Sequence, residues 1–235
     1  MKKLISHYIK AILWIPIILW LSFQDFLENV KIYYKNTHFL KTEFYMFFLY
    51  LFRSPYRLCR VYTIDAPDDK VQKIYGETFL KTAEKLSFFA DIKKDDIYYD
   101  IGCGRGRVVF WHAAFIGCRS IGIDINPVFI RRANWINSKA GLPAEFIKSN
   151  LLNIPMYDAT VIYLYGSAFT EEGIQLVARK LQELASGTRI ISISRRIDLF
   201  QTEQNMPFFI LRNTMSVEYL WGETQAYLFE RTKYS

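Results

Sequence analysis

A strand followed at once by three closely spaced glycines is the feature that most restricts how this chain can fold. Residues 97–101 read I-Y-Y-D-I, an apolar and aromatic run typical of a buried strand, and Gly102, Gly104 and Gly106 follow. Glycines at this spacing let the chain turn tightly and let a ligand approach the backbone. The helix expected next, over residues 108–115, would aim unpaired N–H groups and its positive dipole end at the turn. The pattern predicts a site for the anionic or polar end of a ligand.

A second strand ends in a carboxylate that suits an adenosine. Residues 120–123 form the predicted strand and Asp124 closes it, about two dozen residues after Asp100. A carboxylate there can accept both ribose hydroxyls of a bound nucleoside. The alternative interpretation is an exposed turn residue that caps the helix beginning near Pro127. The G-x-G-x-G spacing also differs from the G-x-G-x-x-G of nicotinamide and flavin enzymes.

Two further strands complete the repeating pattern, over residues 144–147 and 159–164. Between them, Asn150 is placed to hydrogen-bond an adenine edge and Leu151 to pack on its ring. Strands that alternate with helices predict right-handed crossovers and a doubly wound, Rossmann-like α/β sheet. Ligands of such sheets bind at the carboxyl ends of the strands, where all of these candidates fall.

The first sixty residues differ in character, and we divide the chain into an N-terminal helical segment, 1–60, and a ligand-binding domain, 61–235. Residues 11–23 carry no charge, and residues 39–52 are mostly aromatic and apolar. Thirteen uncharged residues are short for a membrane span. We therefore expect residues 4–52 to form hydrophobic helices, a possible membrane foot that lies on the surface or enters the bilayer and returns, although extension of the stretch back to Leu4 leaves a span possible. The alternative is that both stretches are ordinary buried helices.

Charge and cysteine content exclude some functions and leave others open. The net charge of +7 is compatible with nucleic acid, an anionic membrane or an acidic protein, but no long Lys/Arg run makes nucleic acid a required partner. Cys59, Cys103 and Cys118 are odd in number and irregularly spaced, and the histidines are scattered, so we expect no disulfide framework and no metal. No small-x-small cleavage site follows Phe23, which favours a cytoplasmic location, with membrane association through the N-terminal segment.

The region 74–232 resembles the class I methyltransferases, and within them the disruptor-of-telomeric-silencing (DOT) type of lysine methyltransferase, which is not of the SET type. The segment 75–78, Y-G-E-T, precedes D-I-G-C-G-R-G-R-V-V at the spacing of that family. The segment 161–172, V-I-Y-L-Y-G-S-A-F-T-E-E, is similar to the family's segment after the fourth strand. Residues 217–221 and 226–232 are similar to its final strand pair.

This resemblance implies a class I sheet with a C-terminal antiparallel strand pair, S-adenosyl-L-methionine as cofactor, and transfer of its methyl group to a lysine side chain of a protein. It implies that Glu77 and Thr78 contact the methionyl part and that Asp124 holds the ribose. The expected cofactor-binding residues are Tyr75, Glu77, Thr78, Asp100, Gly102, Cys103, Gly104, Gly106, Arg107, Asp124, Asn150 and Leu151. An aromatic channel can hold a lysine ammonium by cation–π attraction, and we assign it to Tyr165, Phe169, Trp221 and Tyr227.

The departures from the family fall mostly on the substrate side. Tyr165 and Gly166 replace its paired asparagines, Arg107 replaces a glutamine, and Asn150 replaces an aspartate at the adenine site. Two other interpretations therefore stay open: a lipid, quinone or small-molecule methyltransferase that uses the apolar foot, and a cofactor-binding regulator without catalysis. A narrow aromatic tube favours lysine, whereas a wide apolar cleft beside the foot favours a lipid.

Overall fold

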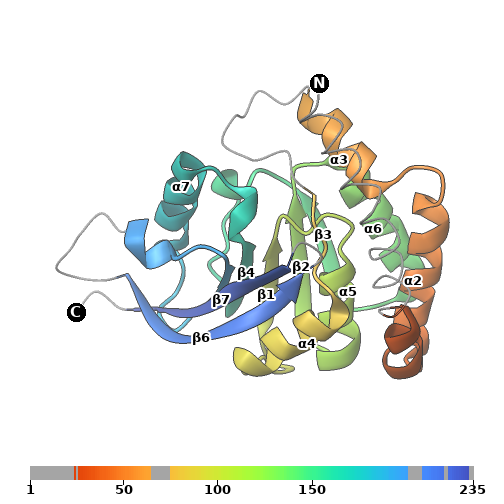
Figure 1. The fold of residues 1–235 in the computed structure, drawn as a ribbon, viewed down its shortest axis with the longest axis horizontal. Coiled ribbons are helices and arrows are strands. Elements are labelled where there is room, and N and C mark those ends of the chain that lie inside the picture. The colour runs from red at the N-terminus through yellow and green to blue at the C-terminus, as the bar shows by residue number, and fades with distance from the viewer. Residues whose placement is uncertain (1–23, 25, 65–74, 201–207, 220–221, 233–235) are drawn as a thin grey trace, which may run out of the picture.

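The computed structural model describes residues 24, 26–64, 75–200, 208–219 and 222–232, and these residues form an α/β fold around one mixed sheet (Figure 1). The sheet has seven strands in the order β3-β2-β1-β4-β5-β7-β6. The strands are β1 (Ile97–Ile101), β2 (Arg119–Asp124), β3 (Ala144–Lys148), β4 (Val161–Tyr165), β5 (Arg189–Ile193), β6 (Phe209–Tyr219) and β7 (Gly222–Arg231). Strands β1 to β5 are parallel, and β6 and β7 are the antiparallel pair expected at the C-terminal end.

The strand order places a binding crevice beside β1, which confirms the prediction of a doubly wound, Rossmann-like sheet. Strand β1 lies between β2 and β4. From β1 the chain continues to β2 and β3 on one side, and it then crosses back to β4 and β5 on the other side. Such a switch point leaves a crevice at the carboxyl ends of the strands. In the register, Asp100 of β1 is opposite Gly122 of β2 and Tyr163 of β4. The predicted strand over 159–164 begins later, at Val161, because Ala159 closes a turn by donating its N–H to Met156 at 3.1 Å.

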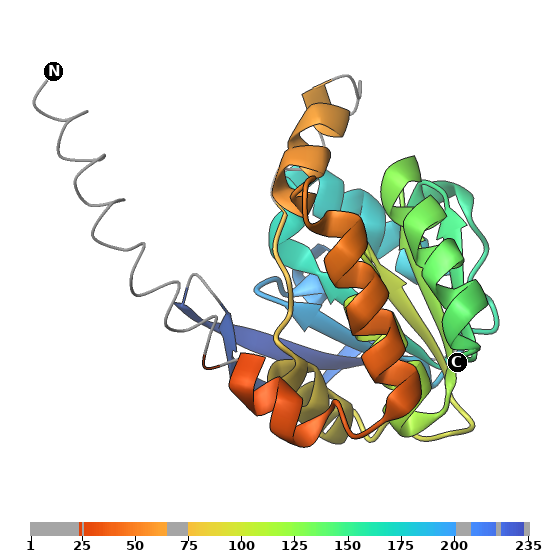
Figure 2. The ribbon, with the colours of Figure 1, turned by 90° about the vertical axis from the view of Figure 1, so that its right-hand side faces the viewer.

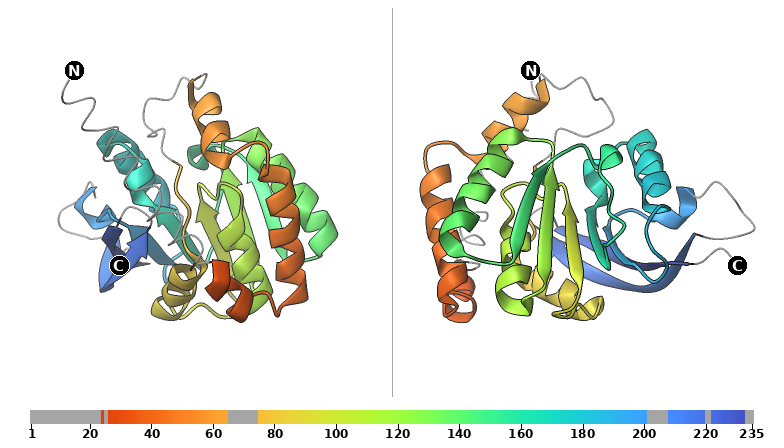
Figure 3. Two further views of the ribbon diagram at one scale, coloured as in Figure 1. Left: turned by 45° about the vertical axis from the view of Figure 1, so that its right-hand side comes forward. Right: turned by 180° about the vertical axis from the view of Figure 1, so that it is seen from behind.

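Helices cover both faces of the sheet (Figure 3). One face carries α4 (Leu80–Phe89), α5 (Arg107–Trp111) and α6 (Pro127–Ala140), and the other carries α7 (Glu171–Leu181) with the short helices η2 (Leu151–Asn153) and η4 (Ile197–Phe200). The helix predicted over 108–115 is α5, which continues as a π-helical turn, η1 (His112–Ile116), and ends at Gly117 with φ +76°. The turn η3 (Gly166–Ala168) follows β4 directly.

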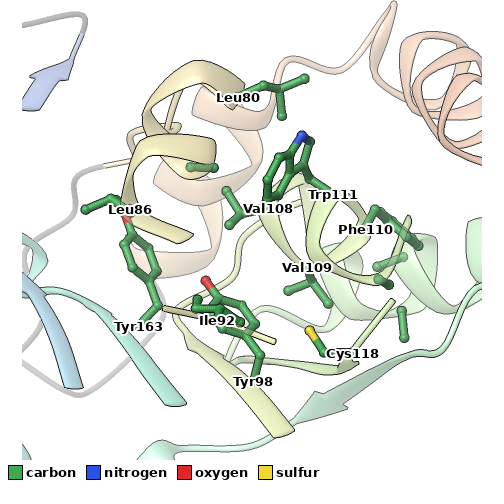
Figure 4. Close-up of a cluster of buried hydrophobic side chains, with 14 of the residues drawn as sticks. Leu80, Leu86, Ile92, Tyr98, Val108, Val109, Phe110, Trp111, Cys118 and Tyr163 are labelled. Carbon is green, nitrogen blue, oxygen red and sulfur yellow. The ribbon is translucent and has the colours of Figure 1, made fainter. Parts of the chain in front are cut away.

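The core beneath α4 and α5 combines aliphatic and large aromatic side chains (Figure 4). Tyr98 of β1 stacks on His112, with ring centroids 3.9 Å apart and planes within 15°. His112 is buried, and its ring nitrogens contact the Ser87 hydroxyl and the Val108 carbonyl, each at 2.9 Å. Burial lowers the pKa of His112 to about 4, so this imidazole is neutral at physiological pH.

The N-terminal part of the chain packs on this core through helix α2 (Thr37–Tyr50), which is followed by α3 (Pro55–Ile64). Figure 2 shows α2, in orange, running beside α6, in green. Phe39, Met46 and Tyr50 of α2 are buried in the same cluster as Trp111. Full burial of a side chain such as Phe39 contributes about 2–3 kcal/mol. The inner face of α2 is therefore part of the core of the sheet domain.

The outer side of α2 and of the bend between α2 and α3 is different, because it exposes phenylalanines. Phe44, Phe47, Phe48 and Phe52 are all exposed, Phe52 by 90%. Among the residues that the structure describes, no helix is both long enough and apolar enough to cross a membrane. The uncharged stretch 11–23 lies outside the described residues. The predicted boundary at residue 60 falls within α3, and the division into 1–60 and 61–235 stays a prediction.

Candidate functional site

One pocket lies over the carboxyl ends of β1, β2 and β4, and most of the predicted site residues line it. The predicted cofactor-binding residues in its wall are Tyr75, Glu77, Thr78, Asp100, Gly102, Cys103, Gly104, Arg107, Asp124, Asn150 and Leu151. Gly106 is the predicted cofactor-binding residue that does not line it. Tyr165 and Phe169, predicted for the acceptor channel, line the same pocket. The fold thus places two of the four predicted acceptor residues beside the predicted cofactor-binding residues.

The glycine turn is packed so closely that side chains would not fit at two of its positions. Gly104 and Gly106 have φ of +53° and +81°, values that other residues rarely adopt. A Cβ on Gly104 would lie 2.9 Å from the Tyr75 ring, and one on Gly106 would lie 2.3 Å from the Phe146 ring. Gly106 therefore supports the turn from beneath, whereas Gly104 lets the segment 75–78 close over it.

Asp124 holds this turn in place. Its Oδ2 accepts the Gly104 N–H at 2.8 Å, and its Oδ1 accepts the Asn126 N–H at 2.7 Å. The helix cap of α6 is Asn126, which accepts the Val128 N–H at 2.9 Å, so the alternative that Asp124 is itself the cap does not describe this site. Burial raises the pKa of Asp124, although the two backbone N–H groups lower it.

Asp100 is the second buried carboxyl group of the pocket. Burial, and then the charge of Asp124, raise its pKa to about 8. The pocket wall also contains the Asn126 side chain, whose buried Nδ2 has no hydrogen-bond partner among the described residues. Two carboxyl groups deprived of water favour a ligand that brings positive charge and hydroxyl donors.

Glu77 lies over the turn in an ion pair with Arg105. Both guanidinium contacts, Arg105 Nε to Glu77 Oε1 and Nη2 to Oε2, are 2.5 Å long, and the Tyr75 hydroxyl also donates to Glu77. Burial alone would raise the pKa of Glu77, but Arg105 lowers it below its ordinary value. The Tyr75 ring packs against Phe129 of α6 and Tyr56 of α3. The segment 75–78 is thus fixed across the pocket by charge and by aromatic packing.

The acceptor side of the pocket begins where β4 ends. Tyr165 is half-buried there and Phe169 is buried, and the Tyr165 ring lies 5.5 Å from that of Tyr219. Tyr227, by contrast, packs with Phe229 and the cluster under α7, and the structure does not bring it into the pocket. Trp221 lies outside the described residues.

Buried hydroxyls join the two sides of the pocket. Thr78 hydrogen-bonds Tyr163 at 2.7 Å, and Tyr163 hydrogen-bonds Tyr219 at 2.9 Å. Thr78 and Tyr163 line the pocket, and burial first, with a smaller effect from the charge of Asp100, raises the pKa of both tyrosines. These contacts link the segment before α4 to β4 and β6.

Sequence reasoning missed several residues of the pocket wall. Cys59 of α3 and Phe129 of α6 reach it from helices whose sequences show only ordinary amphipathic patterns. Asn126 could have been found, because Asn before Pro at the start of a predicted helix is a capping signal. Arg105 and Tyr163 lie inside quoted motifs, but no local pattern indicates that their side chains face the site.

Comparisons with known proteins agree with this geometry. The sequence model of the ANTKMT methyltransferase domain matches residues 100–204. A protein-lysine N-methyltransferase of Saccharolobus islandicus is 31% identical over 121 residues, which cover 50% of this chain and 74% of that protein. A sterol 24-C-methyltransferase of Eremothecium gossypii is 27% identical over 147 residues, covering 60% of this chain and 34% of that protein.

Two further comparisons concern the fold and the DOT type. A histone-lysine N-methyltransferase of Dictyostelium discoideum, specific for H3 lysine-79, is 43% identical over 54 residues, which are 23% of this chain and 3% of that protein. An RNA methyltransferase from Salinibacter ruber, solved with S-adenosyl-L-homocysteine, superposes with a TM-score of 0.56 at 23% identity, covering 68% of this chain and 95% of that one. The structural likeness supports the class I fold.

The residues of the pocket fit S-adenosyl-L-methionine. This cofactor carries a sulfonium, an α-ammonium and ribose hydroxyls, which are the groups that the buried Asp100 and Asp124 favour, and the unpartnered Nδ2 of Asn126 offers a donor for its acceptor atoms. The described residues contain no cluster of His, Cys, Asp and Glu side chains that could hold a metal ion. The chain belongs to the class I methyltransferases, the family of the S. islandicus relative, and its cofactor is S-adenosyl-L-methionine.

Proposed function

We propose that this methyltransferase acts on lysine side chains of a protein. The observation that carries the proposal is the presence of Tyr165 and Phe169 in the same pocket as Asp100 and the glycine turn. Aromatic faces attract a lysine ammonium and enclose its alkyl stem. The S. islandicus relative supports the same acceptor. The short match to the H3 lysine-79 enzyme supports a DOT-type member of the class.

Within this proposal the cofactor residues keep the roles that the resemblance implies. Asp124 accepts the ribose hydroxyls while it holds Gly104, and Glu77 and Thr78 face the methionyl part. Asn150 and Leu151 frame the adenine. The Oδ1 of Asn150 accepts the Leu152 N–H at 3.0 Å, so Nδ2 is the group that would meet the adenine edge.

The reaction requires orientation and exclusion of water more than acid–base chemistry. When bound, the cofactor supplies a methyl group on a positively charged sulfur. Tyr165 and Phe169 hold the acceptor amine in line with it, and the lysine ammonium loses its proton to solvent or to a polar neighbour before attack. The segment 75–78 and α3, which contributes Cys59, cover the pocket and exclude water.

The acceptor is tested with tritiated cofactor, the full chain and a host lysate that is then divided into protein and organic fractions. Wild type is compared with Asp124→Ala and with Phe169→Ala, and cofactor binding is measured on each. The proposal predicts label on protein that both substitutions reduce, with cofactor binding lost in Asp124→Ala alone. Label confined to the organic extract would instead establish the lipid alternative, which the sterol methyltransferase match and the exposed phenylalanines favour. Cofactor binding without any methyl transfer would instead favour the interpretation as a cofactor-binding regulator without catalysis.

We further propose that the enzyme is cytoplasmic and that its N-terminal helices contact a membrane surface. Phe47 and Phe52 are exposed, and the exposed Arg53 and Arg57 follow them in the sequence. Glu43, the one carboxylate within residues 31–64, forms its ion pair with Arg107. Exposed aromatic side chains with basic neighbours suit an anionic lipid headgroup layer.

Vesicle sedimentation tests this contact. Full-length protein should bind vesicles that contain phosphatidylglycerol more tightly than pure phosphatidylcholine, and Phe47→Ser with Phe52→Ser should weaken binding. Phe88→Ser, which removes a phenylalanine exposed by 78% on α4, is the matched control and should change nothing. Equal binding of all variants would refute the role of Phe47 and Phe52.

A further inference from the structure

Two arginines flank the last glycine of the turn, and each is bound by a carboxylate from an earlier segment of the chain. Arg105 pairs with Glu77 of the segment that covers the pocket. Arg107, on the other side of Gly106, pairs with Glu43 of helix α2. The turn is therefore attached at both sides to parts of the chain that precede the sheet.

The contact between Glu43 and Arg107 has the geometry of a strong, sheltered ion pair. Arg107 Nε donates to Glu43 Oε1 at 2.9 Å, and Nη2 donates to Oε2 at 2.8 Å. The two side chains are only 15% and 11% exposed. The Tyr34 hydroxyl also donates to Glu43 Oε2, at 2.9 Å, and helps to fix that carboxylate. Bidentate, charge-assisted contacts of this kind restrict orientation as well as distance.

Arg107 is in a position to transmit this restraint to the cofactor site. It is the first residue of α5 and directly follows Gly106, whose φ is +81°. It also lines the pocket, and its charge lowers the pKa of Glu77, although burial and Arg105 have larger effects on that group. Movement of the Arg107 backbone would displace the turn that Asp124 holds through Gly104.

Helix α2 in turn has a fixed position of its own. Phe39 is fully buried, and Asn36, its N-cap, donates from Nδ2 to the Ala114 carbonyl at 3.0 Å. Tyr50, near the other end of α2, lies 5.1 Å under the Arg105 guanidinium and 4.5 Å under that of Arg132. Through Phe39, Asn36 and the contact of Tyr50 with Arg132, the helix that carries Glu43 is anchored to residues outside the turn.

We propose that Glu43 is a positioning residue of the cofactor site. By holding Arg107 it fixes the glycine turn in the conformation that binds S-adenosyl-L-methionine, so that α2 is an integral part of the site. This assigns Arg107 a role toward α2 in addition to its place in the pocket wall. The inference rests on cofactor use alone and is independent of the acceptor.

Calorimetry of cofactor binding to the full chain tests the proposal with a matched pair of variants. Tyr34→Phe removes the hydroxyl that bonds Glu43, and Tyr33→Phe removes the neighbouring hydroxyl, which bonds Glu84 of α4 at 2.7 Å and does not lead to the turn. Tyr34→Phe should raise the Kd several-fold, whereas Tyr33→Phe should leave it within about twofold. Equal effects of the two variants would overturn the proposal.

A double-mutant cycle identifies the route of the effect. Glu43→Gln should raise the cofactor Kd by about tenfold or more, because one partner of a sheltered pair is removed. If Glu43 acts through Arg107, then Glu43→Gln should raise the cofactor Kd of the Arg107→Gln variant only slightly further. In the single variant Glu43→Gln, kcat at saturating cofactor should stay close to that of wild type while KM for the cofactor rises. Additive losses, or an unchanged Kd for Glu43→Gln at an unchanged melting temperature, would overturn the proposal. If the lysine proposal were wrong, wild type would transfer the methyl group to another kind of acceptor, and the cofactor affinities of the Glu43 and Arg107 variants would not be affected by this.

Discussion

Asp100 and Asp124 face the same pocket from neighbouring strands, and burial together with the charge of Asp124 raises the pKa of Asp100 to about 8. At neutral pH the free enzyme therefore keeps Asp100 largely protonated. A cationic cofactor binds the ionised carboxylate more tightly, so binding and loss of this proton are linked.

The affinity for the cofactor should rise with pH until Asp100 is ionised. Below about pH 8, each unit of pH should lower the Kd by up to about tenfold through this group, and the dependence should level off above it. Calorimetry between pH 6.5 and 9 measures this dependence. Asp100→Asn is the control, because the cofactor's own amino group titrates near pH 8 and that contribution remains in the variant. Identical pH profiles for the two proteins would contradict the linkage.

The buried imidazole of His112 should make the fold sensitive to acid. Its pKa is about 4 in the folded chain and about 6.5 when unfolded, so the unfolded chain binds the proton first as the pH falls. The stabilising effect of the neutral ring is present above pH 6.5 and is lost between pH 6.5 and 4, by up to about 3 kcal/mol. Urea titrations across this range should show the loss in wild type but not in His112→Phe, which keeps a ring against Tyr98. Parallel losses in both would exclude His112 as the cause.

Gly106→Ala should destabilise the fold by roughly 2–4 kcal/mol. The substitution combines a left-handed backbone with a Cβ placed 2.3 Å from the Phe146 ring. Gly141→Ala is the matched control, because Gly141 has φ +67° but a Cβ added there would meet no atom within 4 Å, and its cost should be about 1 kcal/mol. Chemical denaturation compares the two, and equal losses would show that the contact with Phe146 has no role.

Much of the site was predictable because it depends on residues that are close together in the sequence. The strand over 97–101, the glycines and Asp124 follow one another closely, and their local pattern determines both the turn and the end of the sheet where it lies. Contacts between distant segments gave no such signal. Glu43 and Arg107 are 64 residues apart, and charges of opposite sign do not specify which pair will meet.

The interpretation of Tyr227 shows the limit of strand patterns. Successive side chains of a strand point to opposite faces, so an aromatic residue faces the pocket only if the register places it there. In β7 the register pairs Tyr227 with Ser192, and its ring packs in the cluster under α7. Its assignment to the acceptor channel remains a prediction that the pocket geometry does not support.

Tyr165 should contribute to acceptor binding through its ring. Tyr165→Ala should raise the KM for the protein acceptor by roughly 3-fold to 30-fold, the range expected from loss of a cation–π contact, whereas Tyr165→Phe should have a small effect. The Kd for the cofactor should change little in both, because Asp124 and the glycine turn are intact. Steady-state kinetics with a purified acceptor protein measures the difference. If Tyr165→Phe and Tyr165→Ala reduce methyl transfer equally, then the Tyr165 hydroxyl, and not its ring, is the group that binds the acceptor.

The central claim is methyl transfer from S-adenosyl-L-methionine to lysine at this pocket. The most direct measurement is tandem mass spectrometry of host proteins after incubation with the full chain and cofactor that carries a deuterated methyl group, beside Asp124→Ala. The account predicts deuterated methyl-lysine in the wild-type reaction and none with the variant. Deuterated methyl groups on lipids or on other side chains alone, or no transfer at all, would contradict it.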